Sequence, residues 1–370
     1  MWDFEGGKFV SSKDEYGFKS VVEDFKNAKK IRIVTFNISS KKEDPLLQAI
    51  KSLNIDTNIE IITNIPSRAE SYYNGEKGRK WRSTASTNIN TYLAKLNPDT
   101  FNGPIVPFFN FNNHSKIIGT ENIVYIGSAN YSVESKNNYE AGILIEDKQF
   151  IKKLYEIFFE YLKENSVPYF NDNYNQLRLF IISILTRLVN HYENFMDSFF
   201  YIRKNEEAIF INDETKFSQN DLFVMLHDLQ ELTDIQGLIE NIDSVEDEVS
   251  SALEQMYDIL DNMPINDTVD LLAIDGPIYD YITFDIQQKT NDIFESEYSA
   301  MADDGEKLEY YLDISSDNAS DILSDICNDA EIDIYYVKRN LEDIIQSLKY
   351  VDIIIKEISK HTVNPIIDNT

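Results

Sequence analysis

The stretch HSKIIGTENIVYIGSAN, residues 114–130, decides how the first half of the chain folds. Two short β-branched runs flank the turn-forming residues Gly119 to Asn122, which predicts a hairpin with strands at His114–Ile118 and Ile123–Ile126. Residues two apart in an extended chain share a face, so the polar pairs of this stretch project together while the isoleucines enter apolar layers. The polar side chains that the hairpin gathers at one end of the sheet are His114, Lys116, Ser128 and Asn130.

The hairpin lies in a region where short β-branched segments alternate with helical ones. Such interleaving predicts an α/β sandwich, a mixed sheet flanked by helices. The further strands are expected at 31–36, 59–63, 105–111 and 141–145, and the helices at 45–53, 86–96 and 148–164.

Charge divides the chain near residue 165. The 370 residues carry 34 Lys+Arg and 64 Asp+Glu, a net charge of -30. Residues 1–165 hold 22 basic and 21 acidic side chains, whereas residues 166–370 hold 12 and 43. The break falls beside the turn-rich segment 165–168, and one hydrophobic core rarely serves more than roughly 250–300 residues. We therefore expect two domains, 1–165 and 166–370, of which the near-neutral first one can accept a phosphate-bearing ligand.

The second domain is expected to be mainly α-helical, with heptad-like segments. Apolar residues recur at steps of three and four from Ile235 to Met263 and again from Ile334 to Ile358. Each stripe needs a partner helix, either the other stripe within the chain, which the commonness of such stripes favours, or a second chain. Residues 278–286 fit either a strand or a helix.

The single cysteine, Cys327, excludes an intrachain disulfide and a thiolate zinc site. The N-terminal segment has no basic region followed by an apolar one. The apolar stretch 177–189 is short for a bilayer and contains Arg178 and Arg187. We expect a soluble, cytoplasmic protein with no membrane insertion.

The polar set of the hairpin suits phosphoryl transfer without a metal or cofactor. A neutral imidazole at His114 can attack phosphorus and form a phosphohistidine, while Lys116, Ser128 and Asn130 hold the phosphate oxygens. Glu140, ten residues after Asn130, could accept a hydrogen bond from the other imidazole nitrogen and fix its tautomer. Departure of an alkoxide needs a general acid that later activates water, so a second histidine is expected in the same site.

This segment resembles the HKD motif of the phospholipase D superfamily, H-x-K followed by an acidic position and then G-S-x-N. The likeness extends loosely over residues 25–164, and it implies a phospholipase D-like sandwich that works through a covalent phosphohistidine and no metal. The matching residues are His114, Lys116, Gly127, Ser128 and Asn130, with Glu140 at the downstream acidic position.

The sequence departs from the family pattern in two respects. Glu121 stands where the family usually has Asp, and since this position lies in the hairpin turn we expect structural tuning rather than inactivation. Only one motif is present, because His191, His227 and His361 have no lysine two residues later. Single-motif members complete their site across a two-fold axis, so the resemblance implies a homodimer with His114 from both chains.

A cluster of four cations around one tryptophan could form a wall of a nucleic-acid channel, with a solvated loop as the alternative. The other histidines and the acidic runs are expected to be structural. The predicted substrate-binding cations are Lys77, Arg79, Lys80 and Arg82.

Taken together, these features predict a metal-independent phosphodiesterase, specifically an endonuclease acting on DNA or RNA, in a plan that suits bacterial antiviral defence or restriction. One rival is a phospholipid phosphodiesterase or phosphatidyltransferase, which the lack of a basic amphipathic helix disfavours. Another is a non-catalytic assembly module with a vestigial hydrolase site. The acidic residues 166–370 could dock a basic protein partner, or mimic nucleic acid and block the site.

Overall fold

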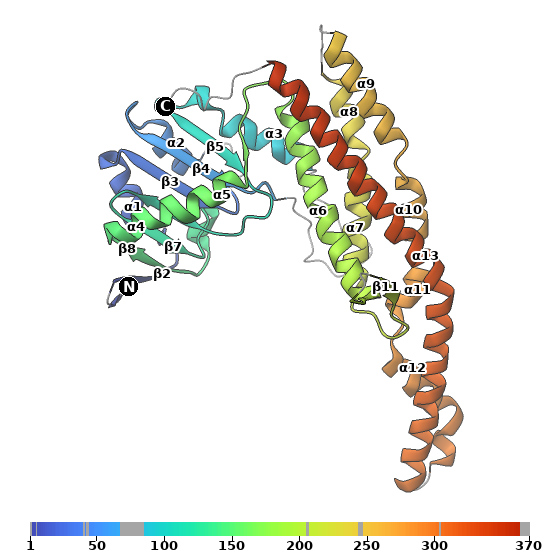
Figure 1. Ribbon diagram of the computed structural model, residues 1–370. Coiled ribbons are helices and arrows are strands. Elements are labelled where there is room, and N and C mark those ends of the chain that lie inside the picture. Colours follow the sequence, from blue (N-terminus) through green and yellow to red (C-terminus); the bar gives the residue numbers. More distant parts are fainter. Residues whose placement is uncertain are drawn as a thin grey trace. The chain divides into compact units, whose positions relative to one another are not determined.

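The computed structural model describes residues 2–4, 6–39, 41, 44–66, 85–204, 207–242, 247–302 and 305–362. The chain divides into two compact units (Figure 1). The first consists of Met1–Ser183, Glu240–Asp243 and Ile355–Thr370, and the second of Ile184–Ile239 and Ser244–Ile354. The first unit is an α/β structure and the second is mainly helical, which confirms the predicted fold class.

The first unit is built on a nine-stranded mixed sheet with the order β1-β2-β8-β7-β6-β3-β4-β5-β9. β3 is parallel to β4, and β4 to β5, whereas the other neighbouring strands are antiparallel. The strands are β1 (Trp2–Phe4), β2 (Gly7–Ser12), β3 (Lys30–Thr35), β4 (Asn58–Thr63), β5 (Ile105–Phe109), β6 (Ile117–Thr120), β7 (Val124–Gly127), β8 (Glu140–Ile145) and β9 (Val167–Pro168).

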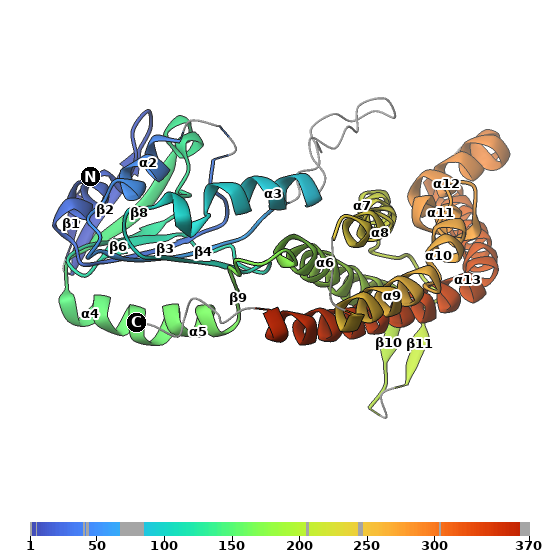
Figure 2. The ribbon, with the colours of Figure 1, turned by 90° about the horizontal axis from the view of Figure 1, so that it is seen from above.

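Helices cover both faces of this sheet, with α2 and α3 on one side and α4 and α5 on the other (Figure 2). Asp44 starts α2 by accepting hydrogen bonds from the amides of Leu46 and Leu47 at 3.0 and 3.2 Å, and Pro45 supplies the fixed φ of the first turn. The helical segments are α1 (Lys19–Asp24), α2 (Pro45–Lys51), α3 (Ala85–Lys95), α4 (Lys148–Lys153), a π-helical stretch (Leu154–Phe159) and α5 (Glu160–Glu164), with short 3-10 turns at Phe25–Asn27, Pro98–Thr100 and Val133–Asn137.

A hydrophobic core fills the space between the sheet and the α4–α5 helix. Strand residues alternate in direction, so β3, β4, β5, β6, β7 and β8 each send apolar side chains to this face. They meet Ile151 of α4 and Phe159 of the π-helical stretch, both at most 2% exposed. The strand members of this cluster are Val34, Ile62, Phe108, Ile117, Val124 and Ile145.

The second unit consists of helices and one small hairpin. The apolar stripe from Ile334 to Ile358 is buried along α13, and Gln255 of α9 donates a hydrogen bond to the hydroxyl of Tyr350 at 3.1 Å. The stripe along α13 is thus buried within one chain, whereas Leu238, Ile242, Ala252 and Ile259 of the first stripe are only partly buried. The elements are α6 (Asn175–Phe199, which begins in the first unit), β10 (Phe200–Ile202), β11 (Ala208–Phe210), α7 (Gln219–Glu231), α8 (Asp234–Glu240), α9 (Asp247–Asp261), α10 (Ile265–Leu271), α11 (Pro277–Thr283), α12 (Ile286–Ile293) and α13 (Gly305–Thr362, which ends in the first unit).

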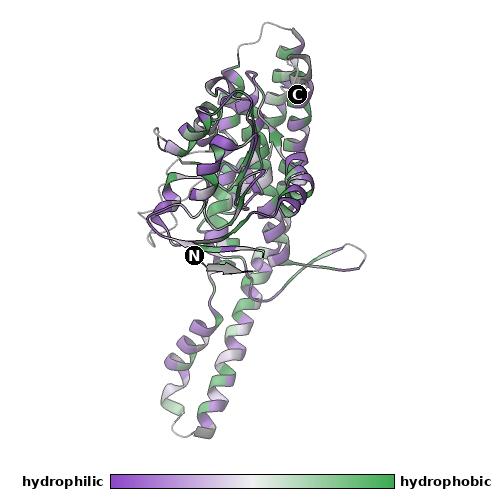
Figure 3. Ribbon diagram, turned by 90° about the vertical axis from the view of Figure 1, so that its left-hand side faces the viewer, coloured by the Kyte–Doolittle hydropathy of each residue, from purple (hydrophilic) through white to green (hydrophobic). Residues whose placement is uncertain are grey.

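These helices carry hydrophobic and hydrophilic residues in alternation along their length (Figure 3). The basic side chains of the unit are scarce, and Arg187, Arg203 and Lys338 form ion pairs with carboxylates of the same unit. Among the described residues, none of the helices is both long enough and apolar enough to cross a bilayer.

Several elements differ from the sequence-based expectations. The strand predicted at His114–Ile118 begins only at Ile117, and the hairpin turn lies at Thr120–Ile123, where the Thr120 amide donates to the Ile123 carbonyl at 2.9 Å. The first stripe is divided between α8 and α9, and the open segment 278–286 is mostly helix α11. Strands β1, β2 and β9 and the hairpin β10–β11 were not predicted, because they are short and acquire their pairing only from distant partners.

Candidate active site

Polar side chains collect at one edge of the nine-stranded sheet. β2, β3 and β7 end there and β6 and β8 begin there, as the register pairs Ser12 with Glu140 and Val34 with Ile117 require. The antiparallel order of these strands therefore brings together residues that are far apart in sequence. Four of the predicted site residues, His114, Lys116, Ser128 and Asn130, line one hollow of about 870 Å³ at this edge.

The segment that carries His114 and Lys116 is held by side chains rather than by a strand ladder. Asn113 is buried, its amide nitrogen donates to the carbonyl of Thr35 at 2.9 Å, and its side-chain oxygen accepts from the amide of Ser115 at 3.0 Å. Asn64 donates to the Asn113 carbonyl at 3.4 Å. These bonds fix the backbone on both sides of the imidazole, which is why the predicted strand starts late.

His114 and Lys116 touch each other in the described structure. The Lys116 ammonium lies 3.2 Å from Nδ1 of His114 and donates to the His114 carbonyl at 2.6 Å. The Phe36 ring stands edge-on to the imidazole, with 4.8 Å between centroids, and 5.5 Å from the ammonium. Burial lowers the pKa of Lys116, and the nearby negative charge of Glu140 opposes that shift. Lys116 therefore places a positive charge directly beside the imidazole.

Ser128 and Glu140 face each other across the β7–β8 pair. The Ser128 hydroxyl donates to the Glu140 carboxylate and accepts from the Ala141 amide at 3.1 Å. The buried carboxylate also accepts from Asn138 at 3.5 Å. Glu140 therefore orients Ser128, and the predicted hydrogen bond from His114 to Glu140 is not formed within the single chain.

Asn130 is oriented by the end of β3. Its side-chain oxygen accepts from the Phe36 amide at 3.1 Å and from the Thr35 hydroxyl at 3.4 Å. With the oxygen occupied in this way, the NH₂ group is the end that remains to donate. An amide donor, a hydroxyl, an ammonium and an imidazole on one hollow form a set that can bind and attack a phosphate group.

The contact with Lys116 sets the tautomer of His114. An Nδ1 that accepts a hydrogen bond from an ammonium leaves the neutral ring with its own proton on Nε2. That form donates a proton to a leaving oxygen, whereas nucleophilic attack needs a bare Nε2. A bound phosphate is a stronger acceptor for Lys116 than imidazole, so substrate binding would draw the ammonium away and release Nδ1.

Gly127 allows close packing at the site. A Cβ on Gly127 would stand 2.5 Å from the Ala141 carbonyl oxygen and would also strike the Tyr125 ring.

Glu121, the departure from the family pattern, accepts hydrogen bonds from the amides of Lys29 and Lys30 at 2.9 and 3.0 Å, where β3 begins. It lies among structural contacts, as expected for a turn position.

Sequence reasoning missed Phe36 and Asn113 as parts of the site. Phe36 directly follows a predicted strand, and its position at the strand end was the available signal. Asn113 precedes the motif in an asparagine-rich turn, where turn chemistry explains the residue equally well. The predicted substrate-binding cations Lys77, Arg79, Lys80 and Arg82 lie outside the described residues.

The histidines of the second unit belong to a buried ionic network. Asp228 accepts from His191 at 2.8 Å and pairs with Arg187, which also binds Glu231 at 2.8 Å. Burial alone would raise the pKa of Asp228, but hydrogen bonds from the two neighbouring histidines and the charge of Arg187 hold it at about 2. His227, Asp228 and Glu231 are close enough to ligate a metal ion, yet the Arg187 guanidinium already neutralises both carboxylates. The network reads as structural.

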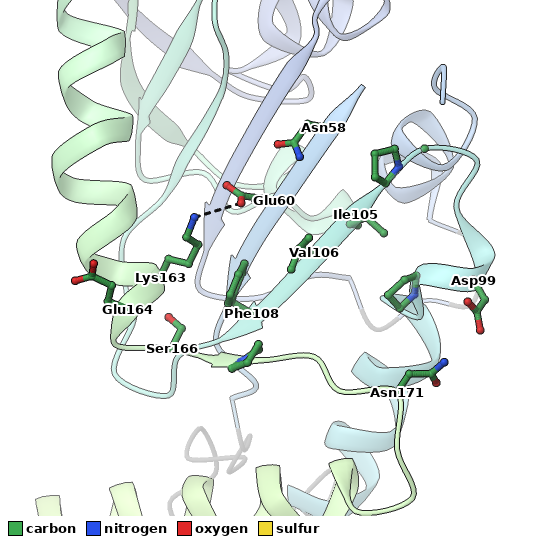
Figure 4. A pocket seen from close by; sticks show the side chains of 14 residues that line it. Asn58, Glu60, Asp99, Ile105, Val106, Phe108, Lys163, Glu164, Ser166 and Asn171 are labelled. Atoms are coloured by element: carbon green, nitrogen blue, oxygen red, sulfur yellow. Dashed lines mark hydrogen bonds and ion pairs between the residues drawn. The ribbon is translucent and has the colours of Figure 1, made fainter. Parts of the chain in front are cut away.

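A second hollow, of about 620 Å³, lies in the first unit between α5 and the strands β4 and β5 (Figure 4). Among the described residues that line it, Lys163 is the basic one. Its ammonium points toward Glu60 and forms ion pairs with Glu60 at 3.3 Å and with Glu160 at 2.7 Å. Because both neighbours are carboxylates, this hollow does not offer a free cation to a phosphate.

Comparison with known proteins agrees with the geometry. The family model described as "Cardiolipin synthase, PLD-like domain" matches residues 21–162. No curated protein matches the chain at the level of significance required.

Among solved structures, the chain is similar to Nuc, a phospholipase D family member from Salmonella typhimurium, with 15% identity, a TM-score of 0.30 and coverage of 44% of this chain and 97% of the other. NucT from Helicobacter pylori shows 19% identity, a TM-score of 0.28 and coverage of 44% and 100%. TrmBL2, an archaeal chromatin protein described with a novel mode of DNA binding, shows 10% identity, a TM-score of 0.27 and coverage of 43% of this chain and 53% of the other. The family match includes His114, Lys116, Ser128, Asn130 and Glu140, so residues 21–162 of the chain form a phospholipase D-like domain.

Proposed function

We propose that this chain is a metal-independent phosphodiesterase, specifically a nuclease that cleaves DNA or RNA at a site shared by two copies of the chain. The observation that carries the proposal is the convergence of His114, Lys116, Ser128 and Asn130 on one hollow at the sheet edge. Each group matches a need of phosphodiester cleavage: a nucleophile, a cation for the equatorial oxygens, and two neutral donors.

In the first step Nε2 of His114 attacks phosphorus, an N–P bond forms, and the P–O bond to the leaving nucleotide breaks. The leaving oxygen needs a proton as it departs. In the second step water attacks, the new O–P bond forms as the N–P bond breaks, and a base takes the proton from water. Lys116 and the NH₂ of Asn130 stabilise the negative charge on phosphorus oxygens in both steps.

The proton donor of the first step and the base of the second can be one group, and the described residues of a single chain place no second imidazole beside His114. We assign that role to His114 of a second copy. In a two-fold dimer each copy presents the same edge to the other, so the second imidazole comes from the same residue of the second copy.

The helix beside the hollow offers a surface for this pairing. Leu154 and Phe158 line the hollow, and on the outer side of the same helix Phe150, Ile157 and Tyr161 are 41, 68 and 62% exposed. We call these five residues the outer apolar face. Its continuity with the hollow supports a second copy that binds beside the site.

The test is cleavage of single- and double-stranded DNA, RNA and phospholipid vesicles by the full chain in excess EDTA. The proposal predicts cleavage of a nucleic acid with EDTA present and a loss of at least roughly a thousand-fold in His114→Ala, since the nucleophile is removed. A strict requirement for a divalent ion would refute the mechanism. Turnover of lipid alone would favour the phospholipid alternative, and turnover of none would favour a non-catalytic assembly module.

The acidic second half completes the proposal as a regulatory or assembly part. Its net negative charge suits a basic protein partner rather than nucleic acid. A role of the whole protein in antiviral defence would require that the nuclease be silent until infection. Comparing the viability of cells that express wild-type chain or His114→Ala, with and without phage, tests that part.

A further inference from the structure

The edge that carries His114 extends beyond the hollow, and one exposed aromatic residue lies on it. Tyr139 directly precedes Glu140 at the start of β8 and is 86% exposed. Because its ring buries so little surface, it contributes little to the core. An aromatic side chain kept in water beside a phosphate site is available for stacking.

The Tyr139 ring is held from the neighbouring strand. The Lys13 ammonium, just after the end of β2, lies 5.1 Å from the ring centroid and donates to the carbonyl of Asn137. The Asp14 amide, on a residue with φ of 64°, donates to the Lys136 carbonyl at 2.7 Å. These bonds join the loop after β2 to the turn before β8. Because Tyr139 is 86% exposed, the ring face turned away from Lys13 is accessible to a ligand.

The sheet fixes how far this ring stands from the reacting group. Strand order at this edge is β2, β8, β7, β6, so Tyr139, just before β8, is two strands from the segment of Lys116 and His114, which lies just before β6. Adjacent strands are about 4.8 Å apart, which puts the two positions at about 10 Å along the edge. Neighbouring nucleotides of one strand can span that distance.

Resting on the proposed function, we infer that Tyr139, supported by Lys13, is a stacking platform for a base of single-stranded nucleic acid next to the phosphate that His114 attacks. A base inside a duplex has both faces covered by its neighbours, so a protruding ring of this kind selects unpaired nucleotides. Asp14 and Glu15 are also exposed in the Lys13 loop, so charge on this side of the hollow is mixed. Stacking, which salt does not screen, therefore contributes more here than phosphate attraction.

The binding experiment uses the full chain with His114→Ala to prevent cleavage. Fluorescein-labelled oligothymidylate, oligouridylate and a duplex of equal length are titrated by anisotropy at low and high salt. Adding Tyr139→Ala should weaken binding of the single strands by about 5- to 150-fold at both salt concentrations, the range found for loss of one stacked base, while Tyr139→Trp retains affinity. The two single strands show whether DNA or RNA is preferred. Tyr201→Ala, at a 65% exposed tyrosine of the second unit, is the matched control and should bind as the parent does.

Equal affinity with and without Tyr139→Ala, or an equal loss for duplex and single strand, would overturn the platform. Hydrolysis of bis(p-nitrophenyl) phosphate by the chain with His114 intact reports the chemistry separately. If this diester is cleaved and Tyr139→Ala does not lower the ratio of oligonucleotide to diester cleavage, the platform is wrong and the phosphodiesterase stands. If neither substrate is cleaved, the proposed function itself fails, and the binding comparison alone decides whether the ring stacks on bases.

Discussion

His114 owes its position to Asn113, the residue before it. The Asn113 side chain joins the end of β3 to the Ser115 amide, so the imidazole stands on a segment fixed by two hydrogen bonds from one buried amide. A buried amide that bridges two backbone groups in this way is costly to remove, because both partners lose a bond at once. The geometry of His114, the proposed nucleophile, therefore depends on a residue that does not line the hollow.

Asn113→Ala should lower the free energy of unfolding by about 1–3 kcal/mol and lower kcat more than it raises KM, since the imidazole loses its support. Urea denaturation and steady-state cleavage measure the two effects. Asn112→Ala is the matched control, because Asn112 is exposed and contributes only its backbone amide to the hydrogen bonds of this turn. If both variants behave alike, Asn113 does not position the imidazole.

The residues of the hollow could be predicted from sequence because the motif keeps them within seventeen positions of each other. The i, i+2 spacing and the hairpin were sufficient to gather His114, Lys116, Ser128 and Asn130. The contact of Glu140 could not be predicted, because its partner depends on the β7–β8 register, which sets Gly127 opposite Gly142 and leaves Ser128 beside the carboxylate. Register arises from tertiary packing rather than from spacing.

At the scale of elements, the edge depends on a hairpin whose strands pass very close to their neighbours. Tyr125 lies across β7 and β8, and its hydroxyl donates to the Ala141 carbonyl at 3.2 Å. Only a residue without Cβ at Gly127 leaves room for that ring. The aromatic ring and the glycine together place Ser128 at the end of β7.

Gly127→Ala should destabilise the first unit by several kcal/mol or force Ser128 away from Glu140, because the new Cβ meets a backbone carbonyl at 2.5 Å. Thermal unfolding and cleavage rate check this. Gly237→Ala provides the comparison: nothing lies within 4 Å of its Cβ position, so that helix should be unchanged or gain up to about 1 kcal/mol. A Gly127→Ala chain as stable and active as wild type would contradict the packing argument.

The alternation of β-branched and amphipathic segments predicted β3, β4, β7 and β8 and the helices between them to within a few residues. It did not predict β1, β2 or β9. β9 has two residues, Val167 and Pro168, and is a strand only because Phe108 and Phe109 of β5 offer it an open edge. Such strands form only through pairing with a distant strand, so the local sequence pattern does not predict them.

At the scale of the whole molecule, the proposed shared site would make activity depend on both copies. If each site needs His114 from two chains, a dimer of one wild-type and one His114→Ala chain is inactive. Equal amounts of the two, unfolded and refolded together so that copies exchange, should retain about one quarter of the activity rather than half. Activity that falls in proportion to the wild-type fraction would show that each chain has a complete site.

The second unit has its own measurable dependence on pH. The folded pKa of Asp228, about 2, lies below the value of roughly 3.9 for an unfolded aspartate, so its stabilisation is complete above pH 4 and is lost as the pH falls toward 2. The loss should be about 2 kcal/mol between those limits. Urea unfolding at a series of pH values measures it. The free energy of unfolding of Asp228→Asn should not show this loss between pH 4 and pH 2. That of Asp261→Asn, at an exposed helix position, should depend on pH as in the wild type.

The excess of carboxylates in the second half of the chain has a consequence for assembly. Residues 166–370 hold 43 acidic and 12 basic side chains, so two copies brought together by the outer apolar face would each carry a large net negative charge. Added electrolyte would screen that repulsion and strengthen the pairing, while it weakens the hold of Lys116 on a polyanion. Cleavage should then rise and fall across a titration with sodium chloride, and the ascending limb should shift with protein concentration because it reports association.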